Sequence, residues 1–482
     1  MAHPEATPPT VATDPMASWD AVHTRQAIIN REVSTSEVIE AAVQRIQALN
    51  PALGALTTTT FDLARDKTRG PSLPAGPLGG VPSAVKDLYD LAGTRTTFCS
   101  RASGTHVSAH TEPAVGQFLS TGLVPLGRSV SSEYGMTPTA EPLGFPPAKN
   151  PWDTAYSTGG SSGGAGALVA ARMVPVAQAT DGGGSTRIPA SCCGLIGLKP
   201  SNGRLVDIEG NTQMPVRLLA AGVLTRTVRD TAAFFAAAEQ TRTNPALPPL
   251  GLVTRPGTDH LRVALVTSTP VTPVHPEVVA ATRYTGKVLE DLGHHVEEVP
   301  MPFGAEQLAD DFFLYWGLLA QALPVVGRLA VGAGFRRDLL DPWTKGLAQH
   351  SRRNLWRLPR AIMRMRRLAT DYAAYMSRFH LLVTPTLALP PPQLGWLDVD
   401  LPFETHRQRA FAFTPFTPLW NVVGAPAISL PMIRSRDGLP IGVQLGAAMG
   451  QERLLLQTAL AIEHAVPFNR ADPARGTISS HG

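Results

Sequence analysis

Two serines embedded in glycine-rich segments constrain this 482-residue chain more than any other feature. Ser161 lies in Gly-Gly-Ser-Ser-Gly-Gly (159–164), and Ser185 ends Asp-Gly-Gly-Gly-Ser (181–185). Glycine has no Cβ atom, so backbone amides in such segments can approach a ligand closely and point several N–H groups at one place. A serine hydroxyl beside such donors has an oxyanion-binding site next to it. The pattern predicts a hydrolytic site on tight loops that uses serine as its nucleophile.

Lys86 is the candidate base for such a site. A serine hydroxyl is a weak nucleophile until a base accepts its proton, and burial can lower the pKa of a lysine toward neutrality. The chain has six lysines among its 42 basic residues, so a lysine directly after the apolar segment 81–85 stands out. Taken alone, Lys86 could also be a surface lysine at the end of a strand.

The glycine-rich segments also carry a family resemblance. Residues 159–200 resemble the signature block of the amidase signature family almost throughout, and the spacings of 75 residues from Lys86 to Ser161 and 24 from Ser161 to Ser185 match that family. Segments 150–152, 421–431 and 439–444 resemble further family segments. The resemblance runs from about residue 17 to about residue 468, and these spacings favour a catalytic role for Lys86.

The resemblance implies roles for individual residues. It implies that Ser185 is the nucleophile, that Ser161 is a bridging serine on a cis peptide bond, and that Lys86 is the base. The implied supporting residues hold the lysine, brace the loop or supply oxyanion-hole amides; they are Ser162, Asp181 and Arg187, with amides at Gly182, Gly183, Gly184 and Ser185.

Two positions depart from the family pattern. Thr186 stands where an aliphatic residue is usual, and Gly-Arg-Ser-Val (127–130) replaces a more usual Gly-Lys-Thr-Asn. Neither departure touches the three catalytic residues, but both could alter the wall of the pocket.

The implied reaction is hydrolysis of a carboxylic amide through an acyl-enzyme, without a metal or an organic cofactor. Esters and carbamates (urethanes) present the same carbonyl, so they are expected side substrates. Aromatic and apolar residues near the family segments predict hydrophobic or aryl substrates, although each could equally be ordinary core. These candidates are Tyr134, Met136, Thr137, Phe145, Trp316, Phe416 and Trp420.

The order of patterns predicts a single α/β/α domain around a central mixed β-sheet, spanning residues 17–468 between a disordered N-terminal tail (1–16) and a C-terminal tail (469–482). Ser34 and Glu37 form a capping-box pattern that opens a helix to residue 49. Strands are expected at 123–127, 173–177, 381–385 and 441–445, a helix at 163–172, and a strand–helix–strand unit at 261–299. The helical segment 306–380, together with 411–420, is expected to form the substrate mouth.

Composition sets limits on class and partners. The net charge is +4, 43% of residues are hydrophobic, and no apolar stretch of 18 residues is uninterrupted, so we expect a globular protein without a membrane span or a secretory signal. Three cysteines without metal-ligand spacing favour a reducing cytoplasm. The expected partners are small-molecule substrates and not nucleic acid, with a monomer or homodimer as the assembly.

One segment is strongly basic. Residues 336–367 carry nine arginines and one lysine against two aspartates, a local charge of +8. Such a segment could attract a membrane surface or nucleic acid. The interpretation that we favour is an arginine-coated amphipathic helix whose other face is apolar. That face would carry Leu355, Leu358, Ile362, Met365 and Leu368.

Other functions fit the sequence less well. Residues 160–164 match G-x-S-x-G, which would make Ser162 the nucleophile of an α/β-hydrolase, but segment 151–158 does not read as the strand such an elbow requires. A phosphate-binding loop would need Lys-Ser/Thr after the last glycine. A glutaminase-type subunit of a tRNA-dependent amidotransferase remains the alternative within the resemblance. The helical segment 306–380 is more like free-standing hydrolases of nylon-type cyclic oligoamides, aryl amides and carbamates.

Overall fold

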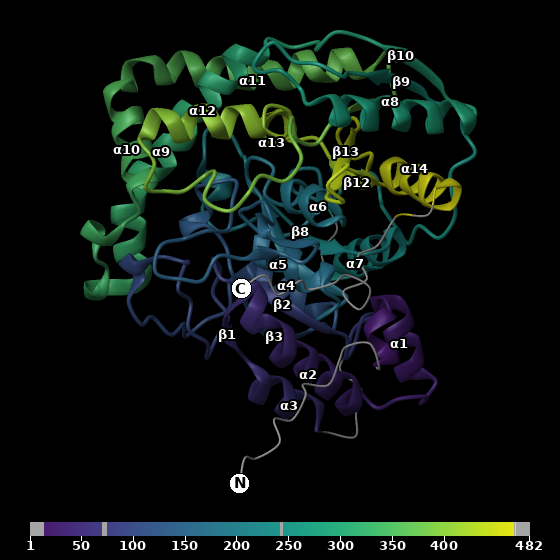
Figure 1. The fold of residues 1–482 in the computed structure, drawn as a ribbon, viewed down its shortest axis with the longest axis vertical. Coiled ribbons are helices and arrows are strands. Elements are labelled where there is room, and N and C mark those ends of the chain that lie inside the picture. The colour runs from purple at the N-terminus through teal and green to yellow at the C-terminus, as the bar shows by residue number, and fades with distance from the viewer. Residues whose placement is uncertain (1–13, 70–74, 242–243, 467, 469–482) are drawn as a thin grey trace.

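The computed structural model describes residues 14–69, 75–241, 244–466 and 468. Within these residues eight strands form a mixed sheet in the order β10-β9-β11-β13-β12-β7-β8-β6 (Figure 1). The strands are β6 Val176–Asp181, β7 Ile196–Lys199, β8 Ala220–Thr225, β9 Arg262–Leu265, β10 His295–Glu298, β11 Leu381–Pro385, β12 Ala427–Arg434 and β13 Pro440–Gly446. β9 pairs in parallel with β10 and β11, and the remaining pairs are antiparallel.

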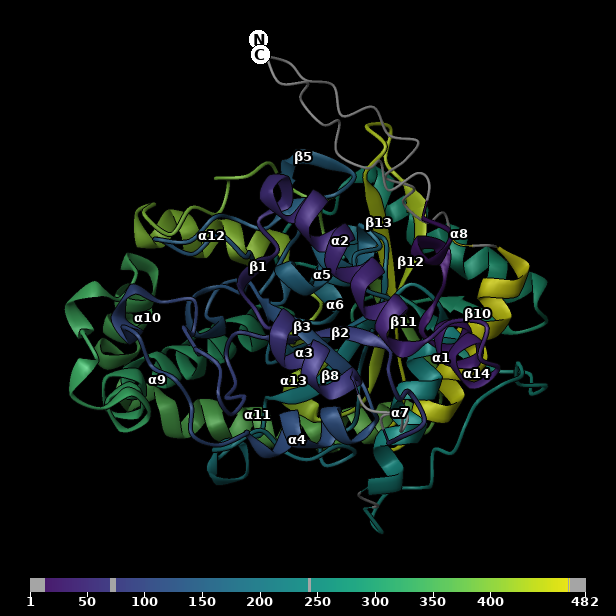
Figure 2. The ribbon, with the colours of Figure 1, turned by 90° about the horizontal axis from the view of Figure 1, so that it is seen from below.

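Alternate side chains of a strand point to opposite faces of the sheet. Hydrophobic clusters bury both of these faces. In β11, Leu381 and Val383 join one hydrophobic cluster and Leu382 joins the other. Helices α7 (Val228–Thr241), α8 (Pro276–Asp291) and α14 (Glu452–Ala465) cover the first face, and α5 (Gly163–Ala170) and α6 (Arg187–Cys193) lie on the second. Figure 2 shows β11, β12 and β13 edge-on between these two helical layers. The predicted α/β/α architecture is confirmed.

A small sheet lies beside the edge strand β6. Its strands β1 (Leu56–Thr59), β3 (Val124–Ser129) and β2 (Pro82–Lys86) are ordered β1-β3-β2. Ser83 Oγ donates to the carbonyl of Val176 at 2.9 Å, and Lys86 N donates to Gln178 Oε1 at 3.2 Å. These bonds hold β2 alongside β6, although the two segments are far apart in the sequence. The remaining elements on this side are α1 Ala21–Ile29, α2 Thr35–Leu53, α3 Phe61–Thr68, α4 Pro113–Ser120, β4 Lys149–Asn150 and β5 Asp153–Ser157. The expectation that segment 151–158 contains no strand is wrong, since β5 lies there, in a two-stranded sheet with β4.

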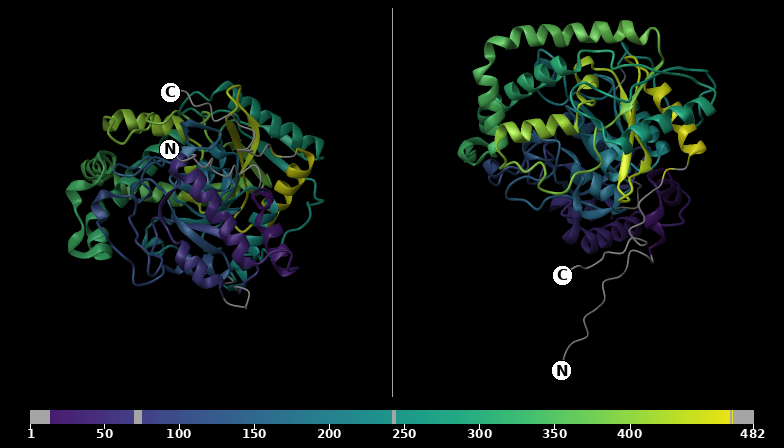
Figure 3. Two further views of the ribbon diagram at one scale, coloured as in Figure 1. Left: turned by 60° about the horizontal axis from the view of Figure 1, so that its bottom comes forward. Right: turned by 45° about the horizontal axis from the view of Figure 1, so that its top comes forward.

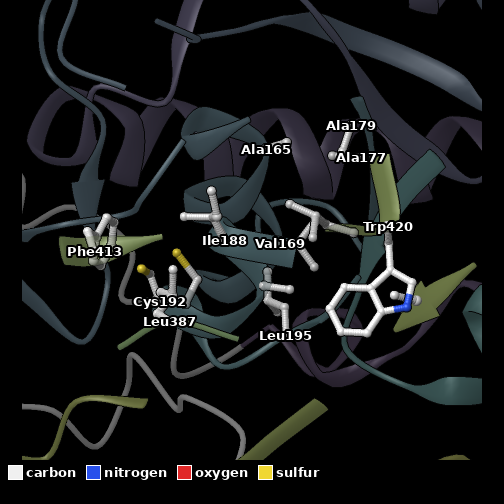
Figure 4. Close-up of a cluster of buried hydrophobic side chains, with 14 of the residues drawn as sticks. Ala165, Val169, Ala177, Ala179, Ile188, Cys192, Leu195, Leu387, Phe413 and Trp420 are labelled. Carbon is white, nitrogen blue, oxygen red and sulfur yellow. The ribbon is translucent and has the colours of Figure 1, made fainter. Parts of the chain in front are cut away.

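In the core beneath the glycine-rich loops, small and aliphatic side chains pack together with the rings of Phe413 and Trp420 (Figure 4). Ala165 and Val169 of α5 pack with Ile188 and Cys192 of α6. Cys192 and Cys193 are buried free cysteines. They act as small packing residues, as their position in the sequence suggests.

A layer of long helices extends to one side of the sheet, away from α8 and α14 (Figures 1 and 3). It contains α9 Ala305–Val331, α10 Pro342–Arg353, α11 Leu358–Met376, α12 Phe403–Phe413 and α13 Pro418–Val423. The basic segment 336–367 is divided between α10, α11 and short 3-10 turns. In α11 the amphipathic prediction is confirmed, since Met365 is buried and Leu358, Ile362 and Leu368 pack against the core. Leu355 precedes the helix and is exposed, so it does not belong to that face.

The described residues contain one helical stretch, 305–334, that is long and apolar enough to cross a membrane by length and composition, and 33% of its most apolar window is buried. Its first half, including Phe313, Leu314 and Tyr315, is packed inside the protein. Core helices of this length pass the same test. The expected absence of a membrane span therefore stays a prediction.

Several boundaries differ from those expected. The capping box of α2 is present, but the helix continues through Pro51 to Leu53, where Gly54, at φ +60°, caps it by donating its amide to the carbonyl of Asn50 at 2.8 Å. Strand β6 starts at Val176, not at residue 173, because the amides of Met173 and Val174 donate to the carbonyl of Leu168. The predicted C-terminal tail and residues 1–13 of the N-terminal tail lie outside the described residues. Pro15 and Met16 already belong to a 3-10 turn, Pro15–Ser18.

Candidate active site

Lys86 lies at the end of β2 and is completely buried. Its Nζ is 2.7 Å from Ser161 Oγ, 2.8 Å from Ser162 Oγ and 3.1 Å from Thr180 Oγ1. Burial lowers the pKa of Lys86 from 10.5 to about 7, and Cys99 and Asp181 act in the opposite direction. The lysine can therefore exchange a proton with the serine hydroxyls near neutral pH. Sequence reasoning did not identify Thr180 as a contact of Lys86. Its position directly before Asp181 on β6 was the available signal.

The two glycine-rich loops meet beside this lysine. The Gly160–Ser161 peptide bond is cis, as the resemblance implies, and Ser162 immediately precedes α5. Ser162 N donates to the carbonyl of Ser185 at 3.3 Å, which joins the loops through their backbones. Both Ser161 and Ser185 are buried, with 2% and 8% of their surfaces exposed. The structure thus brings Lys86, Ser161, Ser162 and Ser185 to one place.

A buried ion pair holds the loop that presents Ser185. Asp181 and Arg187 are fully buried, with Arg187 Nη2 2.9 Å from Asp181 Oδ1 and Arg187 Nε 3.0 Å from Asp181 Oδ2. The guanidinium also donates from Nη2 to Asn421 Oδ1 at 2.8 Å and from Nη1 to Gln444 Oε1 at 2.9 Å. Although burial acts to raise the pKa of Asp181, its bonds with Arg187 and Asn421 prevail and lower it to about 2.

The same ion pair occupies one of the amides predicted to stabilise the oxyanion. The amide of Gly184 donates to Asp181 Oδ1 at 2.8 Å, so this N–H is already engaged inside the loop. Gly184 has φ +126°, a conformation that side-chain-bearing residues rarely adopt, and this brings its amide toward Asp181. Gly182, Gly183 and Ser185 remain as candidate donors.

A cavity opens beside Ser185. Helix α9 supplies the largest share of its mainly apolar wall, and α10 and α12 add further residues. The lining residues are Gly135, Met136, Thr137, Pro138, Gly183, Ser185, Ile188, Ala305, Leu308, Ala309, Phe312, Phe313, Trp316, Trp343, Ala410, Phe411, Thr414, Pro415 and Pro418. None of these described lining residues carries a charge. A Cβ on Gly135 would lie 3.4 Å from Ser161 Oγ, so the cavity also reaches the second serine.

The helical layer contacts the loops around Ser161 and Ser185. The indole N–H groups of Trp316 and Trp343 both donate to the carbonyl of Met136, at 3.2 and 3.0 Å. Phe312 stacks on Trp316 with ring centroids 5.5 Å apart. A Cβ on Gly183 would lie 2.7 Å from Phe312 Cζ, so glycine at this position permits the ring to approach the loop.

The structure separates the predicted substrate-binding residues into two groups. Met136, Thr137 and Trp316 line the cavity, and both predicted segments, 306–380 and 411–420, contribute to its wall. Tyr134 and Phe145 lie outside it. Tyr134 stacks on Phe98 and hydrogen bonds to Ser103, while Phe145 occupies a half-buried loop position.

Phe416 and Trp420 were also predicted to bind substrate, but both are fully buried in the core and neither lines the cavity. Trp420 Nε1 donates to Tyr372 Oη at 3.1 Å, and the Arg187 guanidinium carbon lies 5.8 Å from its ring centroid. Trp420 therefore packs beneath the ion pair and not around a substrate. Phe312 and Phe313 line the cavity, as expected from the aromatic cluster in segment 306–380, whereas sequence reasoning missed Trp343.

Neither departure from the family pattern lines the cavity. Thr186 is buried within the loop. Arg128 is also buried, 3.6 Å from Asp87, and donates to Thr94 Oγ1 at 3.1 Å and to the carbonyl of Tyr89. It fixes the segment that follows Lys86. The described residues contain no group of three or more His, Cys, Asp or Glu side chains that could hold a metal ion.

Comparison with known proteins identifies the family. The Amidase family model matches residues 37–456, and the chain belongs to this amidase signature family. It is 45% identical to a putative amidase, AmiC, of Mycobacterium leprae, over 95% of this chain and 97% of the relative.

Two solved structures of relatives are similar. That of 6-aminohexanoate cyclic dimer hydrolase with its substrate has a TM-score of 0.87 and 30% identity, covering 95% of this chain and 99% of the other. A bacterial aryl acylamidase has a TM-score of 0.81 and 25% identity over 94% and 97% of the two chains. One subunit of the glutamyl-tRNA(Gln) amidotransferase of Thermotoga maritima, at 24% identity and a TM-score of 0.74 over 95% and 97%, shares the fold.

We expect the Asp181–Arg187 pair to be a main determinant of stability. Replacing Arg187 by Met leaves the Asp181 carboxylate buried without its counter-ion, which should lower the free energy of unfolding by about 3–5 kcal/mol. Urea unfolding measures the difference. The double variant Asp181→Asn/Arg187→Met removes both charges and should lose less than the sum of the two single variants. Additive losses would show that the two residues do not act as a pair.

Proposed function

We propose that this amidase is a free-standing hydrolase of neutral, hydrophobic or aryl amides that uses a Ser185–Ser161–Lys86 triad and an acyl-enzyme. The observation that carries the substrate class is the uncharged wall of the cavity beside Ser185. A charged group buried against such a wall would lose its hydration without gaining a partner. Neutral apolar groups bury there at a gain of about 25 cal/mol per Å².

In the proposed mechanism, neutral Lys86 accepts a proton from Ser161, which accepts one from Ser185 as Ser185 Oγ attacks the carbonyl carbon. Amides of Gly182, Gly183 and Ser185 stabilise the resulting oxyanion, at about 3 kcal/mol for a well-placed donor. Ser161 then donates a proton to the leaving nitrogen, because an amide anion leaves poorly. Water repeats the sequence on the acyl-enzyme. Esters and carbamates present the same carbonyl and would follow the same route.

The amidotransferase alternative has less support. Glutamine carries an ammonium and a carboxylate, and the cavity wall offers neither a partner among its described residues. The likeness to the amidotransferase concerns the fold, whereas relatives at higher identity are named as hydrolases of amides. Turnover of a chromogenic anilide by the purified chain without any partner separates the two functions.

The nucleophile is tested by covalent labelling. An aryl fluorophosphonate should modify Ser185, detected by peptide mass spectrometry, and Ser185→Ala should lose at least about a thousandfold in anilide turnover. The variant should unfold at the wild-type temperature, since the loop loses one oxygen. Labelling of Ser162 in place of Ser185 would contradict the assignment and favour an α/β-hydrolase-type elbow.

The base is tested by the pH dependence. Lys86 accepts a proton only in its neutral form, and its pKa of about 7 predicts that kcat/KM falls about tenfold per pH unit below that value. Lys86→Ala should remove this limb and lose about 10²–10⁴-fold on an anilide. The loss should be smaller on an activated ester, whose leaving group needs no proton. Unchanged amide turnover in Lys86→Ala would exclude lysine as the base.

Substrate size should distinguish the two tryptophans. Trp316 lines the cavity, so Trp316→Ala should weaken kcat/KM for bulky anilides more than for acetanilide. Trp420 is core, so Trp420→Ala should lower the free energy of unfolding by about 3–5 kcal/mol and affect small and large substrates alike. A size-selective effect of Trp420→Ala would place that side chain in contact with substrate after all.

A further inference from the structure

A second hollow, which we call the outer groove, adjoins the cavity beside Ser185. Its lining residues are Val271, Thr272, Glu306, Ala309, Asp310, Arg407, Gln408, Phe411 and Ala412. Ala309 and Phe411 line both spaces. Since the side chain of Ala309 is a single methyl group, the ring of Phe411 supplies most of the partition.

The Phe411 ring is held on both sides. On the cavity side, its centroid lies 4.2 Å from that of Phe313. On the groove side, the guanidinium carbon of Arg407 lies 5.4 Å from the ring centroid. Arg407 is fixed in turn, because its Nε donates to Glu404 Oε2 at 2.8 Å and its Nη1 lies 4.0 Å from Asp310 Oδ1. The ring therefore has a defined position between α9 and α12.

The two sides of this partition differ in chemistry. The cavity side carries no charge among its described lining residues, whereas the groove carries the exposed carboxylates of Glu306 and Asp310. These two residues are four apart on α9, so they share one face of the helix. Arg407 is the cation of the groove, and it is already paired with Glu404. A chain that passed Phe411 would leave an apolar space and meet carboxylates.

We propose that Phe411 determines how long a substrate chain the cavity accepts, by separating it from the outer groove. This inference rests on the proposed amidase function and adds a specificity-determining residue to it. The wild-type protein ends its apolar subsite at the ring, so chains that fill the cavity are preferred over longer ones. Removing the ring joins the two spaces and lets the end of a longer chain reach the groove beside Glu306.

The test compares chain-length profiles of wild type and Phe411→Ala. Two series extend the substrate on either side of the amide, namely p-nitroanilides of linear fatty acids and N-alkyl acetamides. In Phe411→Ala the longest accepted chain should increase in one series, with about a tenfold gain in kcat/KM relative to the acetyl member for the first chain that wild type rejects. Phe379→Ala is the matched control, because Phe379 also lies under an arginine but lines neither space. It should keep the wild-type profile.

Binding separates this inference from the proposed function. Dissociation constants for the same two series, measured by calorimetry in a Ser185→Ala background, do not depend on turnover. If the wild-type protein did not hydrolyse amides, the proposed function would be wrong. Identical length profiles for binding to Ser185→Ala and to the double variant Ser185→Ala/Phe411→Ala would overturn the role of Phe411. Phe411→Leu, a milder change, replaces Phe411→Ala in both measurements if the alanine variant does not fold.

The route into the groove has its own test. Long chains that end in a primary amine should bind Phe411→Ala more tightly than chains that end in a methyl group, and Glu306→Gln should reduce this difference. With Phe411 in place, Glu306→Gln should have no effect on it. Phe411→Ala could accept longer chains while Glu306→Gln leaves its preference for amine-ended chains unchanged. That result would show that the chain does not enter the groove, and the proposal would be wrong.

Discussion

The buried Asp181–Arg187 ion pair is the constraint on which the arrangement of the active site depends. A buried pair is tolerated only when its hydrogen-bonding groups are satisfied, and here the partners come from distant parts of the chain. Asn421 on α13 and Gln444 on β13 bind Arg187, while Asp181 accepts the amide of Gly184. The loop that carries Ser185 is therefore fixed from the sheet and from α13 together.

Lys86 reaches this loop from a different sheet. Side-chain bonds hold β2 against β6, and they place the lysine in a fully buried position among Ser161, Ser162 and Thr180. The burial that makes the lysine costly to charge is the same property that brings its pKa near neutrality. Docking of the small sheet on the large one is thus a requirement of the proposed chemistry as well as of the fold.

Sequence patterns predicted the α/β/α fold and brought together the residues around Lys86, because glycine-rich loops and their spacing are local features. The pocket wall was harder to predict, since an aromatic side chain has the same apolar bulk in a core and in a cavity. Trp316 and Trp420 look alike in sequence, yet one faces the cavity and the other packs beneath Arg187. Gly184 was misassigned for a related reason: a glycine run indicates available amides, but only the three-dimensional loop shows which of them Asp181 already binds.

Specificity and chemistry are carried by separate layers that meet at a narrow contact. The proposed catalytic groups lie on β2, β6 and the starts of α5 and α6, whereas α9 supplies the largest share of the cavity wall, with further residues from α10 and α12. Trp316 and Trp343 join the layers through the carbonyl of Met136, which lies in the loop beside Ser161. Phe313 takes no part in this contact, since its ring packs on Trp343 and Phe411 within the helical layer. The core chemistry can then remain the same while the helical layer adapts to amides of different shape.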